Sequence, residues 1–101
     1  MKGKELLSEL NVVHSKVTME DICRQLVDTY NRKNADYDSA FEKSMDEYGL
    51  VSAAIRLSDK LNRFKSLINK EAQVKEESIL DTLLDGAAYN LMTYLYLVNN
   101  G

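Results

Sequence analysis

Apolar residues recur every three or four positions along most of the chain, which is the spacing of amphipathic helices. Thr18, with Asp21 three residues later, is typical of a capping box and predicts a helix over about 19–32. After a polar, turn-forming segment, Ser39 is the expected N-cap of a short helix over 40–48. The apolar stripe of the 19–32 helix consists of Ile22, Cys23, Leu26, Val27 and Tyr30.

Two longer periodic patterns follow Gly49, a residue that ends or bends the short helix. They predict long helices over about 50–69 and 78–98, separated by a polar loop. Ser78 begins the second pattern with Asp81 three residues later, again like a capping box. The apolar stripe of the 50–69 helix consists of Leu50, Leu57, Leu61, Phe64 and Ile68, with Ala54 beside it.

The 78–98 helix is apolar around most of its circumference. Opposite its broad stripe lie Thr82, Gly86 and Thr93, whose small side chains permit the close approach of another helix. Such a helix is normally central in its bundle, and a chain of about 100 residues provides too few helices to surround it. We therefore expect a homodimer or a higher homo-oligomer. The broad stripe consists of Leu80, Leu84, Ala87, Leu91, Leu95 and Val98.

The composition favours an all-α fold, because the chain has no proline and only four glycines, whereas strands joined by tight turns usually need more of both. Its 101 residues correspond to a single domain, 1–101. We expect a small helical bundle in which the two long helices pack antiparallel and the 19–32 helix packs across them. Residues 5–10 are expected to form a short amphipathic turn or helix.

The charge balance excludes some classes of partner. Lys and Arg number 13 against 16 Asp and Glu, a net charge of −3, whereas general binding of nucleic acid or of an anionic membrane needs surplus positive charge. No stretch approaches the roughly 20 apolar residues of a membrane span, and no signal peptide is visible, so we expect a cytoplasmic protein. The single cysteine, Cys23, excludes a disulfide framework within the chain, and His14 lacks the neighbours of a zinc site.

Three acidic residues, Glu77, Asp81 and Asp85, follow one another at intervals of four along the last predicted helix. Carboxylates one turn apart can share Mg²⁺, which prefers oxygen ligands. Alternatively, acids in the first turns of a helix stabilise its dipole, which accounts for Glu77 and Asp81 better than for Asp85. Both interpretations remain open from these residues alone.

A second charged cluster, formed by Arg56, Asp59, Lys60 and Arg63, lies away from the apolar stripe of the 50–69 helix. It is either a solvated face with weak ion pairs or a phosphate site, because forked guanidinium donors match phosphate oxygens. The chain shows no serine–histidine catalytic set, phosphate-binding glycine loop or paired cysteine motif. If it is an enzyme, carboxylates and a metal ion should carry the chemistry.

Four short motifs follow one another along the chain: Lys33-Asn-Ala-Asp36-Tyr37, Asp46-Glu47-Tyr-Gly49, Arg56-Leu-Ser-Asp59-Lys60-x-x-Arg63 and Asp81-Thr-Leu-Leu-Asp85-x-x-x-Tyr89. Together, over about residues 27–97, the chain resembles the "nucleotide modification associated domain 1" family of phages and bacteria. This resemblance implies a nucleotide-related role, often in a phage or prophage. More distantly, the chain is similar to the all-α nucleoside triphosphate pyrophosphatases of the MazG-like and dimeric dUTPase group.

The distant similarity implies a dimer or larger oligomer, Mg²⁺ held by acidic residues of two helices, and cleavage of a nucleoside triphosphate between its α- and β-phosphates. By this resemblance Glu47 is the catalytic residue that orients water or completes the metal shell. The metal ligands it implies are Asp59, Asp81 and Asp85. The substrate-binding residues it implies are Lys33, Arg56, Lys60 and Arg63 for phosphate, with Tyr37 and Tyr89 for the base or sugar.

The sequence departs from the enzyme pattern at two places. The usual Glu-x-x-Glu becomes Arg56-x-x-Asp59, and the usual Glu-x-x-Asp becomes Asp81-x-x-x-Asp85, so at most three acids occupy the four positions. Glu47 precedes Asp59 by about 18 Å along a continuous helix. It therefore joins a metal site only through a bend of the chain or from another subunit.

Two other functions remain open beside the enzyme. The chain is either a module that binds or sequesters a nucleotide without cleaving it, or a structural helical subunit of a phage assembly. If a nucleotide site exists, the two charged clusters must meet in one cleft or at a subunit interface. We then expect Arg56 or Asp59 to reach Asp81 or Asp85, directly or through one bridging residue.

Overall fold

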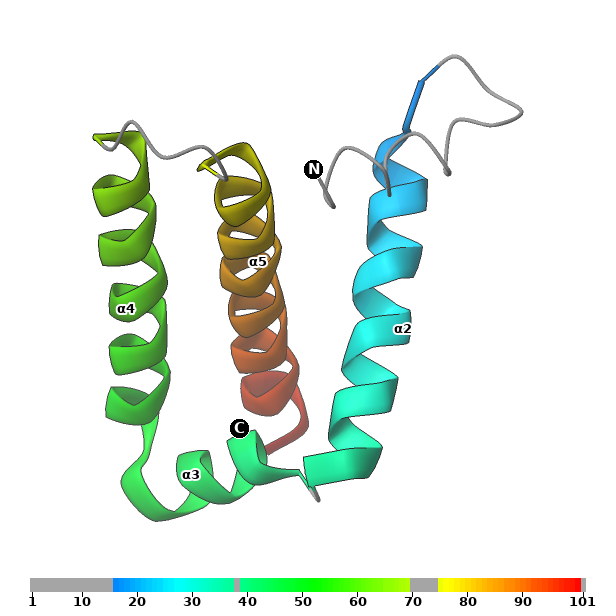
Figure 1. The fold of residues 1–101 in the computed structure, drawn as a ribbon. Helices are drawn as coiled ribbons and strands as arrows, with labels where there is room; N and C mark the ends of the chain where they lie inside the picture. Colours follow the sequence, from blue (N-terminus) through cyan, green and yellow to red (C-terminus); the bar gives the residue numbers. More distant parts are fainter. Residues whose placement is uncertain (1–15, 38, 70–74, 101) are drawn as a thin grey trace.

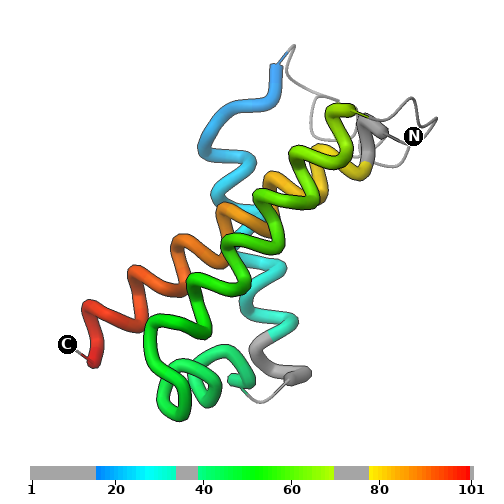
Figure 2. The backbone as a smooth tube through the Cα atoms, turned by 90° about the vertical axis from the view of Figure 1, so that its left-hand side faces the viewer, coloured from blue at the N-terminus to red at the C-terminus, as the bar shows by residue number. Residues whose placement is uncertain are grey.

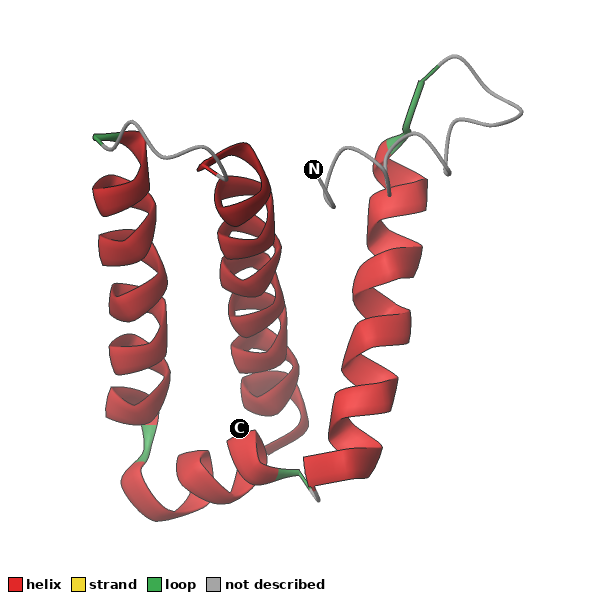
Figure 3. Cartoon of the chain, viewed as in Figure 1, coloured by secondary structure: helices red, strands yellow, loops and turns green. Residues whose placement is uncertain are grey.

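The computed structural model describes residues 16–37, 39–69 and 75–100, with the side chains of 34–37 and 75–77 left out. These residues form helices and contain no strand, as Figure 3 shows, so the predicted all-α fold is confirmed for the described part of the chain. The helices are α2 (Met19–Tyr37), α3 (Ala40–Tyr48), α4 (Leu50–Ile68) and α5 (Lys75–Asn100). Residues 1–15, with His14 and the helix expected over 5–10, lie outside the described residues.

Three long helices, α2, α4 and α5, are joined at one end of the bundle by the short helix α3. In Figure 1, α4 and α5 stand side by side and run in opposite directions, and α3 lies across their foot between α2 and α4. Figure 2 shows that α2 crosses the line of the α4–α5 pair. The predicted antiparallel pair with an earlier helix packed across it is therefore what the chain forms.

The α4–α5 interface depends on the small residues of α5. Thr82 is buried, and its hydroxyl donates to the Ser78 carbonyl oxygen at 2.7 Å, so it places no unpaired polar group between the helices. A Cβ atom built on Gly86 would lie 3.8 Å from Cβ of Lys60, which is van der Waals contact. The small face of α5 therefore lets α4 approach closely, as the sequence predicts.

The first helix begins at its predicted capping box and ends later than predicted. The Asp21 amide donates to Thr18 Oγ1 at 3.1 Å, and the Thr18 amide donates back to Asp21 Oδ2 at 3.0 Å. Instead of ending near Arg32, α2 continues to Tyr37. The segment after Arg32 contains no glycine or proline, and its asparagine and aspartate cost only tenths of a kcal/mol each in a helix.

Of two predicted N-caps, Ser39 is confirmed by its position and Ser78 is wrong. Ser39 directly precedes α3, and its carbonyl oxygen accepts from the Lys43 amide, but its φ of 58° is left-handed and its side chain makes no capping hydrogen bond. Ser78 lies inside α5, which begins at Lys75, and its carbonyl oxygen accepts a hydrogen bond from the Thr82 hydroxyl. Ser78, with Asp81 three residues later, lies within a helix, so this spacing alone does not mark a helix start.

The apolar stripe predicted for the 50–69 helix packs only in part, since Leu57 and Phe64 are half-buried. Leu50, Leu61 and Ile68 remain 49–56% exposed, whereas Ala53 and Leu67 are buried. Because the face that α5 presents is made of small residues, α4 approaches it with the stem of Lys60, and Leu50, Leu61 and Ile68 stay outside. On α5, too, the leucine stripe is largely open, with Leu91 57% and Val98 63% exposed.

None of the helices in the described ranges is long and apolar enough to cross a membrane.

Candidate functional site

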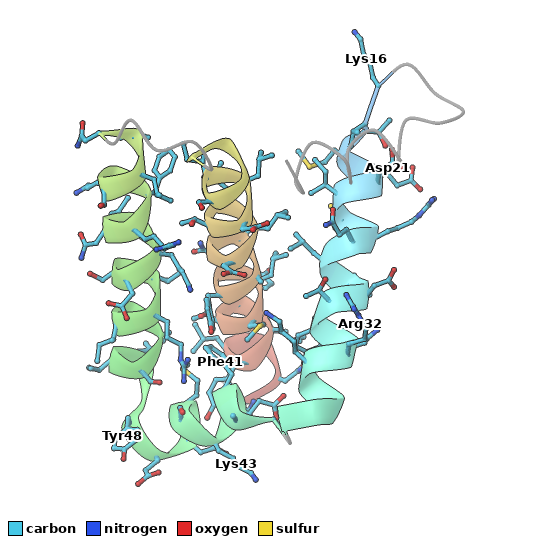
Figure 4. All side chains as sticks on the ribbon, viewed as in Figure 1. Lys16, Asp21, Arg32, Phe41, Lys43 and Tyr48 are labelled. Carbon is cyan, nitrogen blue, oxygen red and sulfur yellow. The ribbon has the colours of Figure 1, made fainter. Side chains whose placement is uncertain are left out.

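A groove of about 630 Å³ opens between α2, α4 and α5, and α3 closes one end of it. Figure 4 shows Phe41 at that end, where α3 meets the other helices. The groove combines cationic, acidic, aromatic and apolar side chains from all four described helices. Its lining consists of Gln25, Leu26, Thr29, Tyr30, Lys33, Ala40, Phe41, Arg56, Lys60, Asp81, Leu84, Asp85, Ala88, Tyr89 and Met92.

Arg56 is a half-buried cation near the α3 end of the groove. Its guanidinium carbon lies 5.5 Å from the ring centre of Tyr89 and 5.9 Å from that of Phe41, at cation–π distance from both. Its hydrogen bonds, to Tyr89 Oη and Ser44 Oγ, are long at 3.5 Å. In the described part of the chain no carboxylate pairs with it. Arg56 is thus held in place with its strong donors available to an anion.

Lys60, one turn further along α4, connects the basic cluster to the acidic one. Its Nζ lies 3.5 Å from Asp85 Oδ2 and 5.8 Å from the ring centre of Tyr89. The two paired side chains are 29% and 46% exposed, so water screens the pair and it contributes little stability. The clusters therefore converge in one groove, with Lys60 making the contact that we expected from Arg56 or Asp59.

The acids of the groove are Asp81 and Asp85, one turn apart on α5. Asp59 does not line the groove, and among the described side chains no three acids, histidines or cysteines come close enough together to hold a metal ion. Mg²⁺ is commonly bound by one or two carboxylates together with substrate phosphates and water. The donor set of Asp81 and Asp85 fits that arrangement, whereas a set of three carboxylates including Asp59 is not assembled within the described chain.

The structure brings some of the predicted site residues together and leaves others apart. Six line the groove: Lys33, Arg56, Lys60, Asp81, Asp85 and Tyr89. Three do not line it, and all three are exposed: Glu47, Asp59 and Arg63. The chain does bend at Gly49, with φ 72°, yet this bend does not bring Glu47 into the groove. The side chain of Tyr37 lies outside the described residues.

The sequence pattern gave no reason to select two of the aromatic side chains of the groove. Tyr30 belongs to the apolar stripe of its helix, and that stripe predicts a core position rather than a groove wall. Phe41 lies in the short helix, where nine residues are too few to define a packed face. Only the path of α3 across the foot of the bundle places Phe41 beside Tyr89, with ring centres 5.9 Å apart.

Fold and groove together define a small all-α protein with a mixed cationic, acidic and aromatic cleft. A family model described as nucleotide modification associated domain 1 matches residues 33–97, about two thirds of the chain, and the chain belongs to that family. The match begins at residue 33, whereas the motifs suggested a start near 27. Comparisons with curated proteins and with solved structures give no match.

Proposed function

We propose that the groove binds the polyphosphate of a nucleotide. The observation that carries this proposal is the state of Arg56: a half-buried guanidinium, positioned by two aromatic rings and without a carboxylate partner in the described chain. Lys33 and Lys60 line the same groove and add positive charge to it. Forked guanidinium donors and ammonium groups are the usual protein partners of phosphate oxygens. The family's description, which refers to nucleotides, supports the same proposal.

We propose further that the chain hydrolyses a nucleoside triphosphate in the manner of the MazG-like pyrophosphatases. Asp81 and Asp85 would hold Mg²⁺ together with phosphate oxygens, and the metal ion would act as a Lewis acid and lower the pKa of bound water. Water adds to the α-phosphorus, the bond from this phosphorus to the bridging oxygen breaks, and pyrophosphate leaves. Arg56, Lys33 and Lys60 neutralise the negative charge of the phosphates during this step. The setting we propose is phage or prophage nucleotide metabolism in the cytoplasm.

A nucleotide-sequestering module is the second candidate, and one observation favours it. The described groove contains two carboxylates, and Glu47, Asp59 and Arg63 lie outside it. Binding through Arg56 needs neither a third acid nor a base that activates water. For the catalytic function, Glu47 or Asp59 would have to reach the groove of another copy in a homo-oligomer. We propose such self-association because large apolar side chains of α4 and α5 are exposed.

The binding proposal is tested by calorimetry with inorganic tripolyphosphate and with nucleoside triphosphates. The Arg56→Gln variant should bind both at least about tenfold more weakly, because a charge-assisted hydrogen bond contributes about 1.5–3 kcal/mol. The matched control is Arg24→Gln, since Arg24 is exposed, pairs with Glu20 at 2.7 Å and does not line the groove. Equal losses in the two variants would contradict a specific role for Arg56. If the wild-type chain binds no nucleotide, the structural-subunit interpretation is favoured.

The catalytic proposal is tested with the Asp81→Asn variant. Asp81 is exposed, so the variant should stay folded while it loses metal-dependent nucleotide binding and turnover. Phosphorus NMR of released pyrophosphate measures turnover, and calorimetry with and without Mg²⁺ measures the metal dependence. Asp28→Asn on α2 removes the same charge outside the groove and should change neither. Undiminished turnover in Asp81→Asn would remove the carboxylate mechanism, and wild-type binding that ignores Mg²⁺ and gives no turnover would favour sequestration.

A further inference from the structure

A second hollow, of about 180 Å³, adjoins the groove at its α3 end. Three side chains, Tyr30, Phe41 and Met92, line both spaces, so the hollow continues the groove beyond Arg56. The rest of its lining comes from α3 and from the C-terminal part of α5: Glu42, Leu95, Tyr96, Asn99 and Asn100. The groove with the proposed phosphate site and this hollow are therefore adjacent and share the wall formed by Tyr30, Phe41 and Met92.

The wall shared by the two spaces has the chemistry that a planar heterocycle needs. Tyr30 and Phe41 supply aromatic faces, on which any of the nucleobases can stack. Met92 supplies a polarizable thioether that adapts its shape to an aromatic ligand. These side chains suit the base of a nucleotide. The phosphates are better matched by the cations of the groove, Arg56 and Lys60.

The order of residues along α5 gives the bound molecule a direction. Asp81 and Asp85 come first, then Tyr89 beside Arg56, then Met92 and finally Asn99. Because α5 is a single helix from Lys75 to Asn100, this order in sequence is also the order in space. A nucleotide lying along α5 therefore has its phosphates toward Asp85 and its base toward the C-terminal end of the helix.

The polar edge of the hollow restricts which base it accepts. The Tyr96 hydroxyl donates to Asp46, so its one donor is used, and one N–H of the Asn100 amide donates to the Tyr96 carbonyl oxygen at 3.0 Å. The Glu42 carboxylate and the Asn99 amide form no hydrogen bond or ion pair within the described chain. An ionised carboxylate only accepts hydrogen bonds, and it therefore selects a base edge that presents an amino group.

Resting on the proposed function, we infer that the hollow at Glu42 and Asn99 receives the nucleobase and prefers one with an exocyclic amino group. Adenine, guanine and cytosine carry such a group, which donates to Glu42. Uracil and thymine have no amino group, and their one ring donor, N3–H, stands between two carbonyl oxygens that face the carboxylate as acceptor against acceptor. The Asn99 amide offers both a donor and an acceptor to the rest of the base edge.

The inference is tested by comparing the affinities of nucleoside triphosphates that differ only in the base. The wild-type chain should bind ATP, GTP or CTP about tenfold more tightly than UTP, which is the effect of one hydrogen bond to a charged group. Glu42→Gln should reduce that preference to about twofold and leave inorganic tripolyphosphate affinity unchanged. Tyr30→Ala should weaken all nucleotides relative to tripolyphosphate. Asp28→Asn, which removes an exposed carboxylate of α2 outside both hollows, should leave the preference intact.

The outcomes separate the base site from the phosphate site. If Glu42→Gln and Tyr30→Ala leave base preference and relative affinities unchanged while Arg56→Gln still weakens tripolyphosphate, the base inference is overturned and the proposed function stands. If wild-type affinity is the same for UTP and for the amino-bearing nucleotides, the inference is likewise overturned. If neither tripolyphosphate nor any nucleotide binds, both the inference and the proposed function fail.

Discussion

Arg56 illustrates how a single side chain changes meaning between sequence and structure. In the sequence it belongs to a charged cluster that is compatible with a solvated face or with a phosphate site. In the structure its guanidinium lies near the rings of Phe41 and Tyr89, 15 and 33 positions away in sequence. Spacing along one helix cannot reveal contacts with two other helices. The basic cluster was therefore predictable as a cluster, while the division into groove-lining Arg56 and Lys60 and outward Asp59 and Arg63 was not.

The two described glycines are expected to respond to alanine in opposite directions. Gly49 has φ 72° and ψ −160°, a region essentially restricted to glycine, so Gly49→Ala should destabilise the chain by about 1–3 kcal/mol although no atom lies within 4 Å of the new Cβ. Gly86 is helical, and its new Cβ would lie 3.8 Å from Lys60 Cβ. Gly86→Ala should therefore stabilise by about 0.5–1 kcal/mol through helix propensity. Urea denaturation followed by circular dichroism measures the free energy of unfolding of both variants. Changes of the same sign in the two variants would contradict the prediction.

At the scale of elements, the helices themselves were predictable and their packed faces only in part. Periodic apolar residues and the Thr18–Asp21 capping box predict α2, and the absence of strand signals predicts the all-α class. The choice of face on α4 depends on what its neighbour offers. Since α5 presents Thr82 and Gly86, a close approach favours the Lys60 stem over Leu61. A prediction from hydrophobicity alone places Leu61 in the packed face of α4, although Leu61 is exposed.

The contact between α3 and the C-terminal end of α5 should weaken at high pH, where Tyr96 loses its proton. The Tyr96 hydroxyl donates to Asp46 Oδ1, and this hydrogen bond, with smaller effects of desolvation and of the Asp46 and Glu42 charges, raises the pKa of Tyr96 above its ordinary value of 10.0. Because the folded-state pKa is the higher one, the stabilisation is complete below about pH 10 and is lost as the pH rises through the folded-state pKa.

Absorbance titration of the tyrosine phenols measures this pKa shift. The titration should run from about pH 8 to about pH 13, so that it covers both sides of the ordinary tyrosine pKa of about 10. Tyr96→Phe identifies the late-ionising phenol by removing it from the titration curve. Asp46→Asn should return its pKa toward the ordinary value, whereas Asp28→Asn should not. A Tyr96 that ionises at the same pH in the wild type and in Asp46→Asn would contradict the assigned hydrogen bond.

At the scale of the whole molecule, the described chain buries little apolar surface. Only Met45, Ala53 and Leu67 are buried apolar residues in the described part of the chain, and no large side chain there is completely inaccessible. On α5, by contrast, Leu91, Tyr94, Leu95, Leu97 and Val98 are 43–71% exposed. Monomeric proteins rarely leave such contiguous apolar faces in water. The apolar circumference of α5, which the sequence predicts, is thus left partly uncovered by the described part of the chain.

We therefore predict that the protein has at least twice the mass of one chain in light scattering at micromolar concentration. Leu91 and Val98 lie seven positions apart on one face of α5, and each should contribute about 1.5–3 kcal/mol when covered. The double variant Leu91→Asp, Val98→Asp should raise the dissociation constant at least about a hundredfold and give monomers. Val27→Asp is the matched control, because Val27 is 56% exposed on α2, away from this face. A monomeric wild type would contradict the assembly, and a double variant that keeps the wild-type mass would exclude this face of α5 as its interface.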